Sequence, residues 1–579
     1  MQTQPHRLLK PIIVLLILTF SGCQKQEGAD QENENNDQLN ILWLVTEDMG
    51  AYIPAFGDST IETPNLSRLA AEGIRYPNMF SPSGVCAPSR AAIATGMYPS
   101  SFGASHMRTG SHTDDTGLPR YEAIPPPEAR MMSEWMRMVG YYCSNNVKED
   151  YQFNAPVTAW DESSYYAHYK NREEGQPFFS IFNFTTTHES GLFEPYGIRK
   201  NELRHYHSGD TAIKQESWNG KTEGDNTPIH VSKDTRFDIP PYLPQNEVGQ
   251  HDMWKVYNNI AEMDRQLGAI LDQLEAEGLM DKTIIFFYPD HGGPLPRQKR
   301  LIYDAGLNAP MIVRFPDKRG AGTIDNQLVS FVDLAPTVLS LAGIAPKDYM
   351  QGQAFLGTFK AEQERKYIHA AADRFDEFTD AIRAVRDKRF KYIRNYRPQQ
   401  PYYLPVSYRE QIPSMKELLR MRKAGELNEV QQLWFRETKD KEELFDCEND
   451  PHELYNLADD PEYADKLNEL RKEMDRWLTA IGDQPNLPER ELIDQLWKGK
   501  DHQPETADPE IEVEGGKVAI KCETEGVSIG YKMIGPDEKE PEAWEVYTGP
   551  VNWQEGSKLL VQAHRIGYKP SETIIYPSN

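Results

Sequence analysis

The chain has 579 residues, of which 39% are hydrophobic and 26% are charged, a composition that supports several packed domains and excludes a wholly disordered chain. Its formal charge of −26 repels polyphosphate, so we expect no nucleic acid among its partners. Five cysteines in this length exclude a disulfide-stapled scaffold. A protein this acidic must gather cations locally if its substrate is an anion.

Residues 1–22 have the pattern of a bacterial lipoprotein signal peptide. Two basic residues precede the apolar stretch Pro11–Phe20, which is too short for the roughly 20 residues that span a bilayer. Small residues then lead into Cys23, an arrangement that resembles a lipobox, in which the cysteine is lipidated. An ordinary secretory leader with an incidental cysteine is the alternative. Residues 23–39 are polar enough for an unfolded tether. We therefore expect an exported protein, lipid-anchored in the outer membrane and facing the periplasm or the cell surface.

Residues 40–365 alternate between apolar runs and helical patterns. Runs that are hydrophobic throughout indicate strands buried on both faces of a parallel sheet. The runs are Asn40–Thr46, Pro177–Phe184, Thr283–Tyr288 and Pro310–Phe315. Helical patterns lie at Thr63–Gly73 and Met253–Gly278. The fold class is therefore α/β, with a mainly parallel central sheet flanked by helices.

The pattern changes towards the C-terminus. Residues 366–503 predict a smaller α+β subdomain, with a hairpin at Ala381–Tyr396 and helices across 414–498. Residues 510–579 alternate in strand fashion and predict an appended small β-sandwich. The aperiodic stretch Tyr196–Gln250 predicts a long functional loop region.

One motif indicates the class of protein. It is the segment Cys86-Ala87-Pro88-Ser89-Arg90, followed by Thr95-Gly96. A chance match to this pattern has a probability on the order of a few in a million. It resembles the signature of the type I sulfatases of the alkaline phosphatase superfamily, and other segments are closest in wording to heparan N-sulfatase-like and bacterial polysaccharide sulfatases. The resemblance covers about residues 40–500. A buried structural cysteine is the alternative, which the full motif outweighs.

The resemblance implies a nucleophile and a maturase. A formylglycine-generating maturase oxidises the cysteine, here Cys86, to formylglycine during export. One hydroxyl of the hydrated aldehyde attacks sulfur and the other later expels sulfate, so no stable ester has to be hydrolysed. Sulfate oxygens carry negative charge, so the site must also supply positive charge.

The resemblance also implies a divalent metal. Glu47 and Asp48 follow the first strand, Asp290 and His291 follow a later one, and together with the side chain derived from Cys86 they fill the family's ligand positions. Carboxylate oxygens suit Ca²⁺, or Mg²⁺ less often. Glu47 stands where Asp is usual and His291 where Asn is usual, so calcium coordination is weakened or reshaped.

Four further cationic side chains transfer from the family. The resemblance assigns Arg90 to holding the nucleophile, Lys148 to contacting it, Lys299 to the sulfate, and His188 to the sulfate and the leaving alcohol as general acid. Asp150 stands where the family usually has His, so the base is Asp150 or lies elsewhere.

Two loops carry residues suited to an acidic sugar next to the sulfated one. His106 and Arg108 lie in one loop and Arg374 in the other, and we place Asp150 with them at the substrate. Ordinary solvated loops are the alternative for both.

The leading hypothesis is a sulfatase that hydrolyses sulfate esters or N-sulfates of a sulfated polysaccharide or its oligosaccharides. One rival is a phosphate or phosphonate ester hydrolase on the same fold, although we locate too few His and Asp ligands for a two-metal phosphatase. The other is a catalytically defunct, lipid-anchored glycan-binding protein. The β tail, which resembles a C-terminal module of some hexosaminidases, favours this second rival.

Overall fold

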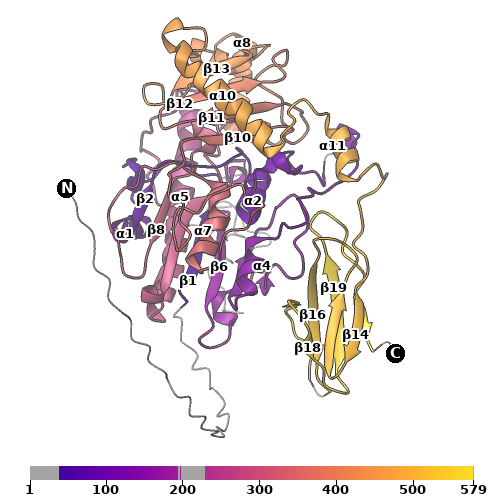
Figure 1. Cartoon of the computed structure of the whole chain (residues 1–579). Helices are drawn as coiled ribbons and strands as arrows, with labels where there is room; N and C mark the ends of the chain where they lie inside the picture. The colour runs from indigo at the N-terminus through magenta and orange to yellow at the C-terminus, as the bar shows by residue number, and fades with distance from the viewer. Residues whose placement is uncertain (1–37, 112, 194–195, 197–228, 537, 578–579) are drawn as a thin grey trace, which may run out of the picture. The chain divides into compact units, whose positions relative to one another are not determined.

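A seven-stranded sheet forms the centre of the computed structural model, in the strand order β2-β8-β7-β1-β6-β4-β5 (Figure 1). The described residues are 38–111, 113–193, 196, 229–536 and 538–577. Strands β7, β1, β6, β4 and β5 run parallel, as the apolar runs predict. The strand bounds are β1 Asn40–Thr46, β2 Ile74–Tyr76, β4 Tyr142–Asn146, β5 Glu162–Ser163, β6 Phe178–Phe184, β7 Thr283–Pro289 and β8 Met311–Arg314.

Strand β8 runs antiparallel to β7, and β2 runs antiparallel to β8. The prediction of a parallel strand at Pro310–Phe315 was therefore wrong in direction, although all four residues of β8 are buried. A continuous apolar run reports burial on both faces and says nothing of strand direction. The connection from β7 contains only the one-turn helix α6 (Asp304–Leu307), which falls short of the helical crossover that a parallel neighbour needs.

Alternate residues of β1 pack into two separate hydrophobic clusters, because successive side chains of a strand point to opposite faces. Leu42 and Leu44 belong to one cluster, whereas Trp43 and Val45 belong to the other. The helices of the first cluster include α1 (Pro64–Glu72) and α5 (Glu247–Ala276). Those of the second include α2 (Cys86–Thr95), α4 (Met132–Arg137) and α7 (Leu334–Leu341). Helices thus cover both faces of the sheet.

Helix α5 begins earlier than the predicted Met253 because Asn246 caps it, its side chain accepting hydrogen bonds from the backbone N–H groups of Val248 and Gly249. The last residues of the predicted loop region Tyr196–Gln250 therefore belong to α5. Much of that region lies outside the described residues, and its described part at 229–246 is irregular.

A second, antiparallel sheet has the order β10-β11-β12-β13, and the predicted hairpin at Ala381–Tyr396 forms its centre. The strand bounds are β10 Ile368–Ala372, β11 Ile382–Arg386, β12 Phe390–Asn395 and β13 Glu442–Asp446. Helix α10 (Ala464–Ile481) packs on this sheet through Leu470 and Trp477. Helices α8 (Pro413–Ala424), α9 (Glu429–Gln432) and α11 (Glu489–Leu496) also fall in the predicted helical stretch, but β13 interrupts it.

The C-terminal residues form two further antiparallel sheets, β14-β15-β18 and β17-β16-β19-β20. The strand bounds are β14 Glu510–Glu514, β15 Lys517–Lys521, β16 Ser528–Ile534, β17 Glu545–Val546, β18 Val551–Asn552, β19 Lys558–His564 and β20 Ile574–Tyr576. Val518 of one sheet and Val561 of the other share a hydrophobic cluster. Arg130 donates a hydrogen bond to the carbonyl of Val527 over 3.0 Å, which ties the tail to the segment before α4.

The predicted signal peptide and Cys23 lie outside the described residues, as does nearly all of the tether. Within the described part of the chain, every helix is too short or too polar to cross a membrane.

Candidate active site

Polar residues gather where three neighbouring parallel strands end. Glu47 and Asp48 follow β1, His188 follows β6, and Asp290 and His291 come at the end of β7. Thr46 pairs with Phe184 on one side and with Pro289 on the other, so the three strands end level with one another. The pairing of the strands therefore brings these side chains to one place, as expected for the carboxyl edge of an α/β sheet.

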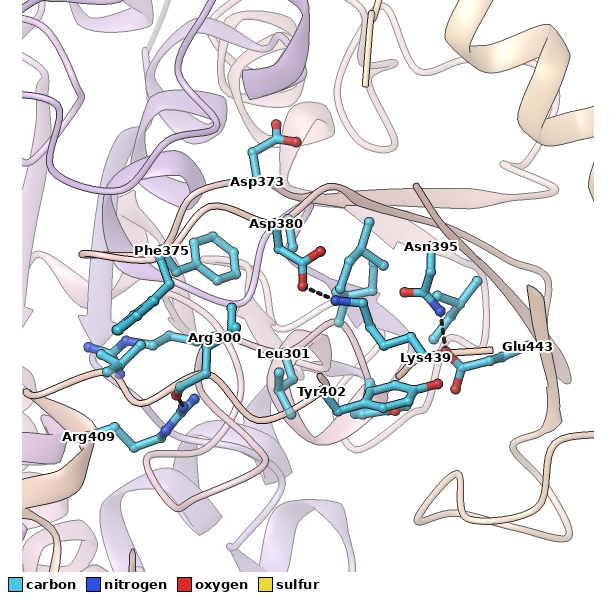
Figure 2. A pocket seen from close by; sticks show the side chains of 18 residues that line it. Arg300, Leu301, Asp373, Phe375, Asp380, Asn395, Tyr402, Arg409, Lys439 and Glu443 are labelled. Carbon is cyan, nitrogen blue, oxygen red and sulfur yellow. Dashed lines mark hydrogen bonds and ion pairs between the residues drawn. The ribbon is translucent and has the colours of Figure 1, made fainter. Parts of the chain in front are cut away.

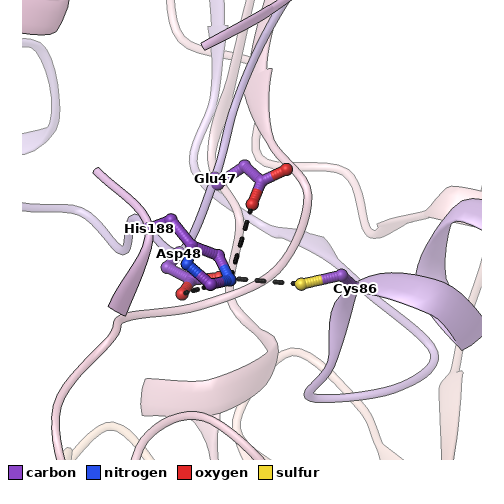
Figure 3. A group of neighbouring side chains, drawn as sticks. All are labelled: Glu47, Asp48, Cys86 and His188. Atoms are coloured by element: carbon purple, nitrogen blue, oxygen red, sulfur yellow. Dashed lines mark hydrogen bonds and ion pairs between the residues drawn. The ribbon is translucent and has the colours of Figure 1, made fainter. Parts of the chain in front are cut away.

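Cys86 is the first residue of α2 and is fully buried beside this edge. Its Sγ lies 3.5 Å from His291 Nε2 and 3.9 Å from Asp48 Oδ1. Figure 3 shows the sulfur directed from the start of the helix towards Asp48 and His188. The helix start also offers free backbone N–H groups and a partial positive charge, which favour an anion.

The predicted metal ligands form two overlapping groups. Asp48, Cys86, Asp290 and His291 place one donor atom each within 4.8 Å of one another, and so do Glu47, Asp48, Cys86 and His188. Glu47 therefore sits with His188 rather than with the later pair. All of these side chains are buried, and buried carboxylates need positive charge.

The residues present fit a divalent cation. Burial alone would raise the pKa of Asp48, but Lys299, His188 and His291 hold it well below its usual value. Burial alone would lower the pKa of His291, but Asp290 and Asp48 raise it to about 10. The buried carboxylates thus need positive charge beside them, which neighbouring cationic side chains or a bound cation can supply. The oxygen donors are those that Ca²⁺ and Mg²⁺ prefer, with one imidazole added.

Arg90 and Lys148 line the other side of Cys86. Arg90 Nη2 lies 3.2 Å from Glu47 Oε1 and 3.2 Å from Asp290 Oδ2. Lys148 Nζ lies 2.5 Å from Glu47 Oε1. Burial lowers the pKa of Lys148, yet Cys86 and Glu47 raise it above its usual value. The carboxylate of Glu47 thus contacts both cations.

Lys299 and His188 meet on the remaining side. Lys299 Nζ lies 3.3 Å from His188 Nε2 and contacts both carboxylate oxygens of Asp48. His188 Nδ1 accepts a hydrogen bond from the backbone N–H of Ser190, an arrangement that leaves Nε2 to face the site. The structure therefore brings Cys86, Arg90, Lys148, His188 and Lys299 together, as the sequence predicts.

Arg108 and Asp150 stand at the edge of this cluster. Arg108 Nη1 lies 3.9 Å from Asp150 Oδ1, and the Arg108 side chain is 43% exposed. Asp150 Oδ2 lies 3.9 Å from Lys148 Nζ. Both Arg108 and Asp150 have left-handed backbones, with φ of 56° and 55°, conformations that persist where the surroundings hold them.

His106 and Arg374 have different partners from the expected sugar. Arg374 is buried and donates to both carboxylate oxygens of Glu489, over 2.8 and 2.9 Å. His106 Nε2 lies 3.8 Å from the same carboxylate, and burial lowers the pKa of His106. The guanidinium of Arg374 is thus committed to contacts within the protein, and Arg108 is the arginine that remains open to solvent.

A neighbouring cavity of about 40 Å³ adjoins the site through Arg300 (Figure 2). Lys439 Nζ lies 2.5 Å from Asp380 Oδ2, and Asn395 donates to Glu443 over 2.7 Å, so these polar groups pair with one another. The rest of the lining is largely apolar, including Phe375 and Leu301. The cavity is too small for a sugar unit and is not the substrate site.

The sequence analysis missed several residues of this site. Asn183 accepts a hydrogen bond from Arg90 over 2.7 Å and donates one to Asn145 over 2.9 Å. A lone amide inside the apolar strand β6 was the available signal. Glu189, Arg300 and Asp376 were also missed, and nothing in their local sequence distinguishes them.

Known proteins share both the sequence and the fold. The Sulfatase family model matches residues 39–344, and the model for the C-terminal part of N-sulphoglucosamine sulphohydrolase matches 297–427. An ulvan-active sulfatase of Formosa agariphila is 64% identical over 98% of this chain and 97% of its own length. A solved 2-O GAG sulfatase has a TM-score of 0.54 at 18% identity, over 77% of this chain and 93% of that one. A phosphonate monoester hydrolase from Silicibacter pomeroyi has a TM-score of 0.51 at 15% identity, over 78% and 96%.

Solved proteins named as a sulfatase and as a phosphonate monoester hydrolase share this fold, so the fold alone leaves the class of protein open between them. The family match and the 64% identical relative narrow this class. The chain belongs to the sulfatase family and is a sulfuric ester hydrolase.

Proposed function

We propose that this sulfatase removes sulfate from ulvan or a closely related polysaccharide and its oligosaccharides. The observation that carries the proposal is the buried Cys86, at a helix start, within 3.9 Å of Asp48 and 3.5 Å of His291. The 64% identity to an ulvan-active sulfatase along nearly the whole chain supports the substrate class. A phosphonate hydrolase on the same fold is the weaker alternative, because its support is a likeness of fold at 15% identity, whereas the 64% identical relative is a sulfatase.

The nucleophile is formylglycine made from Cys86 by a maturase that acts during export. The motif around Cys86 supports this, as does membership of the sulfatase family. Arg90 and Lys148 offset negative charge at the reacting group, since both face Glu47 and lie beside the start of α2. Their buried positions strengthen each interaction relative to water.

Calcium is the metal that the donor set suits best, held by Asp48, Asp290 and His291 with the group derived from Cys86, while Glu47 lies beside Asp48 in the overlapping group. When bound, it supplies Lewis-acid polarisation of a sulfate oxygen and a more acidic nucleophile hydroxyl. Mg²⁺ is the second choice, because it requires stricter octahedral geometry.

His188 and Lys299 act on the ester from the opposite side. With Nδ1 held by the Ser190 hydroxyl and backbone N–H, Nε2 of His188 faces the site, and a proton bound there can pass to the leaving oxygen. Lys299 binds the sulfate oxygens from a position next to Nε2. Asp150 stays near Lys148 and acts as the base or orients that lysine.

Arg108 recognises an acidic sugar unit next to the sulfated one. It is partly exposed and close to the nucleophile, and guanidinium suits a carboxylate. Arg374 and His106 support the loop that carries Arg108, since Arg374 also donates to the Met107 carbonyl over 3.0 Å.

We infer from the sequence that Cys23 is lipidated and that residues 40–365, 366–503 and 510–579 act as the catalytic domain, its subdomain and a β module. The protein then works in the outer membrane, facing the periplasm or the exterior, where the polysaccharide is within reach.

One experiment tests the proposal. The chain is produced with a maturase, the peptide containing residue 86 is examined by mass spectrometry, and sulfate release is measured from ulvan oligosaccharides and from a sulfated galactan. We expect formylglycine and a rate on ulvan at least about tenfold higher, with no release by Cys86→Ala of unchanged Tm. Equal rates on both glycans would refute the substrate class, and an active Ala variant would refute the nucleophile.

A further inference from the structure

Glu189 is a buried carboxylate next to the sulfate site. It follows His188 directly and is 1% exposed. Its backbone N–H donates to Asp48 Oδ2 over 2.7 Å, which fixes the main chain against the proposed metal site. Its Oε1 lies 3.2 Å from Lys299 Nζ. The sulfate and Glu189 therefore share the same ammonium group, if Lys299 binds sulfate as proposed above.

Two further buried charges hold Glu189 in place. Its Oε2 accepts a hydrogen bond from Arg300 Nη1 over 2.9 Å, and Arg300 Nε donates to Asp376 Oδ2 over 2.6 Å. Arg300 and Asp376 are each 4% exposed. The backbone of Arg300 is left-handed, with φ of 72°, a conformation that the contacts on both sides stabilise. Glu189 is thus fixed and cannot turn away from a bound anion.

Glu189 places a full negative charge 3.2 Å from Lys299 Nζ. Buried charges are poorly screened, so this carboxylate acts on whatever anion Lys299 binds. A sulfate monoester carries one negative charge, whereas a phosphate monoester carries nearly two above its second pKa of about 6. The energetic penalty is therefore about twice as large for phosphate.

We propose that Glu189, positioned by Arg300 and Asp376, determines specificity by making the anion site favour singly charged sulfate esters over doubly charged phosphate esters. An added negative charge selects between the two substrates, since it repels a doubly charged phosphate ester more than a singly charged sulfate ester.

The test replaces Glu189 with Gln in the matured full chain. The amide keeps the shape and an acceptor for Arg300 but removes the charge. Phenyl phosphate, a dianion at about pH 8, and diphenyl phosphate, a monoanion, are used as inhibitors of aryl sulfate hydrolysis. We expect the Ki of the dianion to fall about tenfold and that of the monoanion about threefold, because the Coulomb energy scales with charge.

Asp376→Asn provides a second variant. We expect both Ki values to fall by less than in Glu189→Gln, again with twice the free-energy change for the dianion, since this carboxylate lies behind Arg300. Glu473→Gln is the matched control: it removes a buried carboxylate that pairs with Arg476 and His369 elsewhere, and it should leave both Ki values unchanged. Equal shifts for the two inhibitors, or no shift in either variant, would overturn the proposal. Sulfatase activity in the parent together with such a result would refute the role of Glu189 alone, whereas an inactive parent with formylglycine in place would refute the proposed function.

Discussion

Lys299 contacts Asp48 through both carboxylate oxygens, at 2.8 Å from Oδ1 and 2.7 Å from Oδ2. Lys299 and a metal ion are therefore alternative partners for the same carboxylate. In Lys299→Met, Asp48 loses this partner and depends more on a bound cation. We expect the rise in Tm on adding Ca²⁺ to be larger in the variant than in the parent, while aryl sulfate hydrolysis falls about 100-fold. Thermal melts across a Ca²⁺ titration measure the first effect, and an equal or smaller rise would contradict the competition.

Removal of the metal should lower activity and Tm together. A bound cation stabilises only the folded state, and Asp48 and Asp290 repel each other without it. Chelator titration followed by melting and by sulfate release measures both effects, with Ca²⁺ addition as the reversal. Asp48→Asn and Asp290→Asn should each reproduce the loss of activity. If neither Tm nor activity responded to chelator, the metal assignment would be wrong.

Arg108→Ala should separate substrates by size. Arg108 is partly exposed and has a loose pair with Asp150, so its loss should mainly remove the proposed contact with the neighbouring sugar. We expect KM for an ulvan oligosaccharide to rise about tenfold, equivalent to roughly 1.4 kcal/mol, while KM for an aryl sulfate stays within about twofold. Steady-state kinetics on the two substrates decide the matter, and equal losses would place Arg108 in the sulfate site instead.

Arg374→Ala should act on stability. The change leaves Glu489 buried and without its bidentate partner, so we expect the free energy of unfolding to fall by about 3–5 kcal/mol. Arg389→Ala is the control: its pair with Asp446 involves a side chain that is 47% exposed, and such pairs contribute little because solvent screens them. Denaturant unfolding measures both, and similar losses in the two variants would contradict this reading of Arg374.

Acid should destabilise the fold through His168. Burial lowers the pKa of His168 from 6.5 to about 4, and the hydrogen bond with Gln273 only partly offsets this. Nδ1 also accepts the backbone N–H of Lys170, and a proton there would break that bond. The unfolded state binds the proton at the ordinary pKa, so this contribution is present above pH 6.5 and is lost as the pH falls towards 4. The loss amounts to as much as about 3 kcal/mol.

Denaturant unfolding at a series of pH values measures this loss. His168→Asn keeps an acceptor for the Lys170 N–H and should flatten the dependence between those two pKa values. His502→Asn, at an exposed histidine, should leave it as in the parent. An unchanged slope in the His168→Asn variant would assign the acid sensitivity to other groups.

The central strands and the site around Cys86 could be predicted because their signals are local. An apolar run indicates a buried strand wherever it lies, and the strand ends place Asp48, His188 and Asp290 at one edge. The direction of β8 has no such signal, because burial on both faces is the same for either direction.

The partners of individual charges could not be predicted either. Arg108 and Arg374 both lie in polar loops, yet one is open to solvent and the other is buried against Glu489. Glu489 lies more than a hundred residues further along the chain, and sequence spacing carries no record of that contact. The same holds for Glu189, whose partner Arg300 is equally remote in sequence.

The level ends of β1, β6 and β7 have a consequence for how this enzyme can change over evolution. Thr46 pairs with both Phe184 and Pro289, so the hydrogen-bonding register of the sheet sets the relative height of the residues that follow. A deletion or insertion of one residue in β1 would displace Glu47 and Asp48 by about 3.3 Å and exchange the two faces of the strand. Leu42 and Trp43 would then enter each other's clusters. The enzyme can therefore acquire new substrates through substitutions and loop insertions. It cannot do so through changes in the length of these strands, because such changes would displace the site residues.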